Sequence, residues 1–118
     1  MNSCHIQIRG WFIQKINVTA YLIDHYAFEI PLERLAKIAC MGTTKLKSSF
    51  KQLHDCTITE YIQQRRMSQA EHLLINTNFT MGQIAEMIGY STSSRFAELF
   101  RKSTGILPGE YRKIARRK

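Results

Sequence analysis

Cysteine is scarce in this chain of 118 residues, and its pattern excludes two classes of protein. The three cysteines, Cys4, Cys40 and Cys56, form neither a C-x-x-C pair nor any other zinc-ligand spacing. An odd, unpaired set excludes a disulfide framework and is typical of a reducing compartment. The run His54–Cys56 has the composition of a Cys/His nucleophile pair, but a turn between two helices is the interpretation we prefer. We therefore expect no catalytic residues, no cofactor and no metal.

Long apolar runs and acidic residues are also few. No stretch approaches the ~18–20 apolar residues of a membrane-spanning helix, and the N-terminus lacks the apolar core of a secretory signal. Nine Asp and Glu stand against 17 Lys and Arg, a net charge of +8. Residues 45–118 carry 13 of the basic side chains but only six of the acidic ones. We expect a soluble, cytoplasmic protein with no contact with membranes. The positive charge is consistent with a polyanionic partner, but basic small proteins that bind no nucleic acid have such a charge as well.

Proline is limited to Pro31 and Pro108, and no alternation of apolar and polar residues is long enough to predict a strand. The spacing of apolar residues instead predicts an all-α fold of about seven helices. Their expected ranges are 15–28, 31–39, 43–54, 57–75, 81–88, 92–103 and 108–115. Capping-box patterns at Thr57–Glu60 and Thr80–Gln83 predict two of the helix starts, and Ser91 is the expected cap of helix 92–103.

The same periodicity predicts the buried face of each helix. The first helix is expected to bury Ile16, Ala20, Ile23 and Ala27, and the second Leu35, Ile38 and Ala39. For helix 43–54 the expected set is Leu46, Phe50 and Leu53, and for helix 92–103 it is Phe96, Leu99, Phe100 and Ser103. The opposite faces of these helices should therefore meet solvent or a partner.

Residues 35–61 and 84–111 repeat one pattern. Leu35, Ala36, Ile38 and Ala39 match Ile84, Ala85, Met87 and Ile88 at an offset of 49, and Leu46, Phe50, Lys51, Glu60 and Tyr61 match Phe96, Phe100, Arg101, Glu110 and Tyr111 at an offset of 50. Each copy has two helices joined by a tight, glycine-containing turn, which is typical of a helix-turn-helix motif. The small alanine allows the second helix to cross closely over the first.

The length of the helix between the two copies has a physical meaning for DNA binding. At 1.5 Å per residue the helix at 57–75 is about 28 Å long, close to the ~34 Å between successive major-groove faces of DNA. One rigid helix could therefore hold two reading helices about one turn of DNA apart. The alternative is a seven-helix bundle whose repeat reflects only an ancestral duplication.

Two stretches of the chain carry a resemblance to a known family. The first is Glu60–Met67 (EYIQQRRM), followed by Ala70, Leu73 and Leu74, and the second is Ile84–Ser91 (IAEMIGYS), followed by Phe96, Phe100–Lys102, Gly105, Pro108, Tyr111 and Arg112. With these motifs, residues 15–115 resemble the DNA-binding domain of AraC/XylS-type transcription regulators. The resemblance implies a bacterial protein with two helix-turn-helix subdomains on a long helix, which binds an asymmetric operator in adjacent major-groove segments.

The chain departs from the family pattern at two turns. Its first turn, Cys40–Thr43, replaces a usual Gly-Met-Ser-Pro, so the helix at 43–54 lacks the serine cap and needs Thr43 or backbone groups in its place. Asp55 stands where the second copy has Gly105. Aspartate tolerates the left-handed conformation better than most residues do, so we expect the turn to survive.

The resemblance also implies a domain organisation. We expect an N-terminal extension or linker remnant at 1–14, a first helix-turn-helix subdomain at 15–56, a linker helix at 57–75 and a second subdomain with a basic tail at 76–118. The tail is expected to be solvated or weakly attracted to phosphate. An effector or dimerisation domain, if there is one, lies outside this chain.

Helical-wheel positions and the family's base-contacting positions coincide on the helices at 43–54 and 92–103. The expected base-contacting residues are Thr44, Lys47, Ser48, Ser93, Ser94, Arg95, Ala97 and Glu98. Arginine and lysine donate to guanine, glutamate accepts from cytosine, and alanine contacts only the thymine methyl group. Lys51, Arg101 and Lys102 lie one turn further and are expected to contact phosphates.

These residues favour a sequence-specific DNA-binding regulator associated with the nucleoid, with double-stranded DNA as its partner. A second hypothesis is a protein-interaction module that contacts RNA polymerase through helix 57–75. The two differ in their response to salt, because only DNA binding depends steeply on it. A third, a thiol enzyme or DNA-repair protein on the same fold, would need a cysteine cluster that the sequence does not have.

Overall fold

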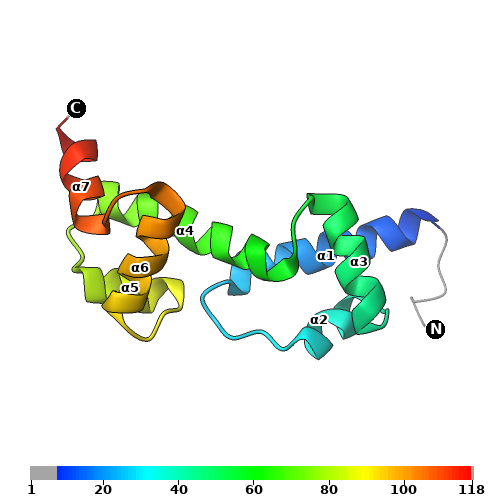
Figure 1. Cartoon of the computed structure of the whole chain (residues 1–118). Coiled ribbons are helices and arrows are strands. Elements are labelled where there is room, and N and C mark those ends of the chain that lie inside the picture. Colours follow the sequence, from blue (N-terminus) through cyan, green and yellow to red (C-terminus); the bar gives the residue numbers. More distant parts are fainter. Residues whose placement is uncertain (1–7, 118) are drawn as a thin grey trace. The chain divides into compact units, whose positions relative to one another are not determined.

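A computed structural model describes the backbone of residues 8–117 and the side chains of residues 17–117. The described residues form seven helices and no strand, which confirms the predicted all-α class (Figure 1). The helices are α1 (Ile8–His25), α2 (Leu32–Ala39), α3 (Thr43–His54), α4 (Ile58–Asn76), α5 (Met81–Ile88), α6 (Ser93–Thr104) and α7 (Pro108–Arg116). From α2 onward, each expected boundary differs from the observed one by at most one residue.

The first helix differs most from its expected range. α1 begins at Ile8, so the described part of the expected N-terminal extension is helical. Its buried side chains are Val18 and Leu22, whereas Ala20 and Ile23 are exposed. The predicted face was therefore wrong, because apolar residues lie on more than one side of α1 and the residues of α2 and α3 pack against the side with Val18 and Leu22. The side chain of Ile16 lies outside the described residues.

The chain divides into two compact units, residues 1–63 and 64–118. In the first unit, α1, α2 and α3 enclose a core of buried residues, and the first turns of α4 pack against it through Ile58, Tyr61 and Ile62. The core consists of Val18, Leu22, Leu35, Ala36, Ala39, Leu46 and Phe50. Ala36 and Ala39 are 7% and 0% exposed, as expected where two helices of a helix-turn-helix motif cross closely.

The second unit buries the matching residues of the repeat. Its buried side chains are Met67, Ala70, Leu73 and Leu74 of α4, Ile84, Ala85 and Ile88 of α5, Phe96 and Phe100 of α6, and Pro108 of α7. Both units therefore bury apolar side chains at matching positions of the two-helix motif. α4 is continuous and contributes its first turns to one unit and the remainder to the other.

Two predicted inner positions were wrong in the same way, one in each copy. Leu53 is 36% exposed, and Ser103 is exposed as well. The next residue turns inward instead in both helices. His54 is bonded to the Thr19 hydroxyl at 2.7 Å, and the Thr104 hydroxyl donates to the Phe100 carbonyl at 2.8 Å.

The predicted capping boxes are confirmed. The Glu60 amide donates to the Thr57 hydroxyl at 3.1 Å and the Thr57 amide to the Glu60 carboxylate at 2.8 Å. The Thr80–Gln83 box has the same pair of bonds, at 3.1 and 2.9 Å. The predicted cap of α6 was wrong by one residue: Thr92, not Ser91, accepts from the Arg95 amide at 3.1 Å.

The turn after each helix of the motif is left-handed. Asp55 has φ 58° and its repeat counterpart Gly105 has φ 90°, so the expected tolerance of aspartate is confirmed. Cys40 (φ 55°) likewise matches Gly89 (φ 105°). At the start of α3, Gly42 is the N-cap and makes no side-chain hydrogen bond, so α3 begins without the side-chain cap that α6 has.

Candidate nucleic-acid interface

In the first unit, the outward face of α3 carries four of the predicted DNA-contacting residues. Thr44, Lys47, Ser48 and Lys51 are all exposed. They line one side of a hollow of about 870 Å³ whose other walls come from the segment around Ile30–Leu35 and from the first turn of α4. The lining also includes the apolar side chains of Ile58 and Ile62, and Lys47 and Lys51 give the hollow its positive charge.

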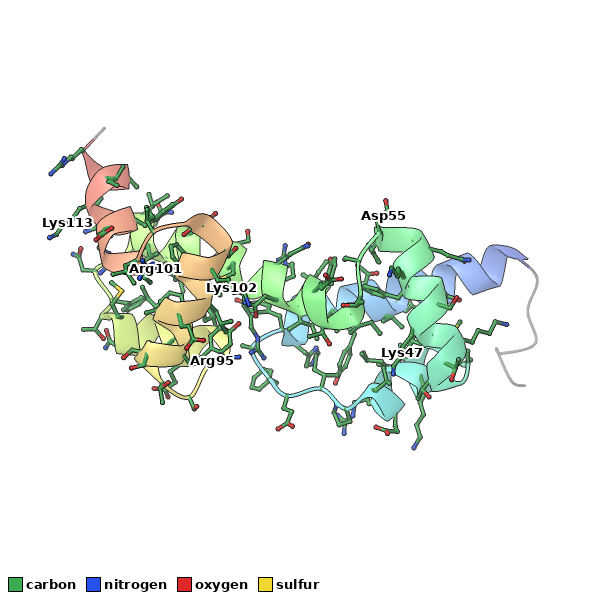
Figure 2. All side chains as sticks on the ribbon, in the orientation of Figure 1. Lys47, Asp55, Arg95, Arg101, Lys102 and Lys113 are labelled. Atoms are coloured by element: carbon green, nitrogen blue, oxygen red, sulfur yellow. The ribbon has the colours of Figure 1, made fainter. Side chains whose placement is uncertain are left out.

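In the second unit, α6 presents the matching face. Figure 2 shows Arg95, Arg101 and Lys102 on α6 and Lys47 on α3. The exposed residues of the α6 face are Ser93, Ser94, Arg95, Glu98, Arg101 and Lys102. Ala97 is half-buried, so only part of its methyl group is accessible. The predicted reading residues of the second copy therefore lie on one helix, with Phe96 and Phe100 fully buried behind them.

The exposed α6 face contains an ion pair. Arg95 donates from Nη1 to Glu98 Oε1 at 3.2 Å, across one turn of the helix. Both side chains are more than half exposed, so the pair contributes little to folding stability. The Thr92 hydroxyl holds the Arg95 amide, so this residue is anchored through its backbone as well.

Behind each face, the second helix of the motif is fixed by an aromatic pair. The Phe50 and Tyr61 rings meet edge to face, with centroids 5.5 Å apart and planes at 84°. The repeat counterparts Phe100 and Tyr111 have the same arrangement, at 5.3 Å and 79°. Edge-to-face pairs of this kind are favourable beyond the area they bury. Each reading helix is therefore locked to the helix that follows it.

The arginines of α4 and α7 have structural roles that the sequence analysis did not assign. The Arg66 guanidinium lies 4.9 Å from the Tyr90 ring centre and donates to the Gly89 carbonyl at 3.4 Å, which ties α4 to the α5–α6 turn. Arg112 donates to the Leu74 carbonyl at 3.0 Å. Arg116 donates to Asn78 Oδ1 at 2.9 Å and also to the Thr77 carbonyl.

The expectation of a merely solvated tail was therefore wrong for two of its arginines. The last turn of α4 has no basic residue, and cations stabilise the carbonyl end of a helix. Arg112 and Arg116 supply this charge from α7. Burial, and then the charge of Arg116, lower the pKa of Arg112. The missing cation in the last turn of α4 was the one sequence signal of this role.

The part of the chain that the structure describes bears on metal binding, membrane insertion and thiol reactivity. Within it, no three His, Cys, Asp or Glu side chains lie together in a way that could hold a metal. None of its helices has the length and apolarity to cross a membrane. Burial is the main cause that raises the pKa of the Cys56 thiol, followed by Glu60 and Asp55, and a raised pKa disfavours the reactive thiolate.

Comparison with known proteins identifies the family to which the chain belongs. The profile of the family described as "Helix-turn-helix domain" matches residues 35–114. The bifunctional transcriptional activator/DNA repair enzyme AdaA of Bacillus subtilis is 33% identical over 99 residues, which are 84% of this chain and 47% of AdaA. The chain spans less than half the length of AdaA and of two other curated regulators that it matches.

Solved structures have the same fold. The C-terminal domain of AraT, a response regulator from Geobacillus stearothermophilus, aligns with a TM-score of 0.80 and 26% identity over 86% of this chain and 84% of that one. The DNA-binding domain of AdpA, solved in complex with a target DNA, aligns with a TM-score of 0.82 and 23% identity over 88% of this chain and 94% of that one. The predicted resemblance is thus confirmed: the chain belongs to the helix-turn-helix domain family, with the duplicated motif of the AraC/XylS type.

Proposed function

We propose that the chain is the DNA-binding part of a bacterial transcription regulator and reads duplex DNA with α3 and α6. The observation that carries this proposal is the repeated placement of exposed cationic residues on the second helix of each motif. The second helix of a helix-turn-helix motif is the one that enters the major groove. The relatives support it, since AdaA is named a transcriptional activator and AdpA was solved with its target DNA.

Specific reading is assigned to residues in the first turns of the two helices, all of them exposed except the half-buried Ala97. On α3 these are Thr44, Lys47 and Ser48, and on α6 they are Ser93, Ser94, Arg95, Ala97 and Glu98. Lys47 and Arg95 are the strongest candidates for guanine contacts, since their N–H groups match the acceptors of that base. The serines accept or donate and discriminate weakly.

Phosphate contacts are assigned to Lys51, Arg101 and Lys102. All three are exposed and follow the base-reading residues by about one turn of helix. A phosphate contact fixes the register of the protein on the duplex without reading sequence. We therefore expect these residues to determine the salt dependence of binding.

The operator should lack two-fold symmetry. α3 reads with lysine and hydroxyl groups, whereas α6 presents Arg95 and Glu98, so the two helices favour different base pairs. A single chain with two unlike readers has no reason to prefer a palindrome. As a regulator, the protein would act in the cytoplasm at the nucleoid and communicate with RNA polymerase; an enzymatic activity is not part of this proposal.

Selection of bound sequences from a random duplex pool, followed by fluorescence anisotropy across a salt series, tests the function. We expect one enriched motif, sub-micromolar affinity at low salt and a linear fall of log affinity with log salt concentration. Failure to bind any duplex at low salt would contradict the proposal. If the chain instead binds a polymerase subunit with little response to salt and no duplex, it is a protein-interaction module.

A further inference from the structure

The reading face of α3 carries only positive charges, whereas the reading face of α6 carries a negative charge as well. α3 runs TTKLKSSFKQLH and has no acidic residue, and its exposed Lys47 and Lys51 meet no carboxylate of their own helix. α6 runs SSRFAELFRKST and places Glu98 on the exposed face among Arg95, Arg101 and Lys102. A carboxylate on a surface that approaches DNA repels the phosphates, so it weakens general attraction to the duplex.

Stability does not explain why Glu98 is there. An exposed pair one turn apart on a helix contributes little to folding stability. In the structure the Arg95 guanidinium nevertheless lies against Glu98, with Nη1 3.2 Å from Oε1, so the carboxylate favours one direction of a long, flexible side chain. The Thr92 hydroxyl holds the backbone of Arg95 at the same time, so both ends of this residue are oriented.

The guanidinium can serve Glu98 and a base together. It has five N–H donors in a planar fork, and the bond to Glu98 engages Nη1. The remaining donors suit the paired acceptors at the major-groove edge of guanine. A phosphate, by contrast, would have to compete with the carboxylate for the same cation.

We propose that Glu98 is a positioning residue that directs Arg95 toward a base edge and withholds it from phosphate, and so determines the specificity of α6. This inference rests on the proposed DNA-binding function and deepens it, because it changes Glu98 from a reader of cytosine into the residue that orients a reader of guanine. The consequence is that Glu98 suppresses binding to random DNA while it sustains binding to the selected site.

The test compares Glu98→Gln with Glu86→Gln, which makes the same change of net charge on the exposed face of α5, outside the reading helices. Affinities for the selected site and for a random duplex are measured across a salt series. For Glu98→Gln we expect about threefold tighter binding to random DNA, a selected-to-random ratio reduced about tenfold, and a salt slope steeper by roughly one contact, 0.9 in the log–log plot. Glu86→Gln should leave the ratio unchanged.

The double variant Arg95→Ala/Glu98→Gln separates positioning from direct reading. If Glu98 acts through Arg95, the Glu98→Gln change has little further effect on the ratio once Arg95 is absent. An equal loss of specificity with and without Arg95, or equal behaviour of Glu98→Gln and Glu86→Gln, overturns the inference while the DNA-binding function stands. Absence of duplex binding by the unaltered chain overturns the function and the inference together.

Discussion

Arg112 of α7 donates from Nε to the carbonyl of Leu74 at 3.0 Å, although the two residues lie 38 positions apart in sequence. The bond fixes α7 on the last turn of α4, where the helix has unsatisfied carbonyls and no cation of its own. Arg116 reinforces the same joint through Thr77 and Asn78. Arg112 and Arg116 of α7 thus supply the positive charge that the last turn of α4 does not have.

Arg112→Met should therefore destabilise the protein by about 1.5–3 kcal/mol, the range for a hydrogen bond to a charged group. Methionine keeps most of the aliphatic volume, so the loss reports the bond and its charge. Urea unfolding followed by circular dichroism measures the change. Lys113→Met, at the exposed neighbouring position, is the control and should change stability little. An equal loss of stability in the two variants would argue against a stabilising role of the bond between Arg112 and Leu74.

Glu60 makes stability depend on pH. The backbone hydrogen bond from Thr57, together with the Thr57 hydroxyl, lowers the pKa of Glu60. A lowered folded pKa means that the contribution is present above the unfolded value, near 4.3, and is lost as the pH falls through the folded value. We expect Glu60→Gln to flatten the fall of the melting temperature in this acid range.

Glu110 offers a matched control for that measurement. It occupies the same position of the repeat, but the N-cap of its helix is Leu107, which makes no side-chain cap bond. In the Glu110→Gln variant the melting temperature should fall with decreasing pH in the same way as in the unaltered protein. The role of the capping box in acid stability would be refuted by equal flattening in the two variants.

The left-handed conformation of Asp55 predicts that two small substitutions, to alanine and to glycine, change the stability of the protein in different directions. At φ 58° a residue with a Cβ atom is strained, and aspartate tolerates this conformation because its short polar side chain can hydrogen-bond locally. Asp55→Ala loses that compensation and should cost about 1 kcal/mol, whereas Asp55→Gly removes the Cβ atom and should be neutral or stabilising. Asp55 is exposed, so little packing is lost in either variant. Thermal unfolding of the pair measures the difference, and equal stability of the two would contradict the strain argument.

Substitutions on the reading faces should separate specificity from general affinity. Arg95→Ala should cost about 1–3 kcal/mol on the selected site and relax one base position. Lys51→Ala should weaken binding to all sequences alike and reduce the salt slope by about one contact. Binding to selected and random duplexes, measured for both variants, distinguishes these results. Identical losses on both kinds of DNA for both variants would refute the division of roles.

Local chemistry predicted most of the helix boundaries, because caps such as Thr57 and Thr80 and end residues such as Gly89 act within one turn of chain. Helix faces were harder to predict. In α1, apolar residues lie on more than one side, and contact with α2 decides in favour of Val18 and Leu22.

The contacts that the sequence could not reveal join distant residues. The bond between Thr19 and His54, which turns the end of α3 inward, connects α1 and α3. The arginines of α7 act on α4 in the same way. Periodicity carries no information on such pairs, since neither partner breaks a pattern. The predicted reading residues were all on the α3 and α6 faces, and whether they contact DNA stays a prediction.

The duplicated aromatic lock has an evolutionary consequence. Phe50 with Tyr61 and Phe100 with Tyr111 hold the two reading helices from behind, each with residues of its own unit. Neither lock uses an exposed side chain of α3 or α6. One helix can therefore acquire new surface residues without disturbing the scaffold of the other, so the two faces can diverge independently.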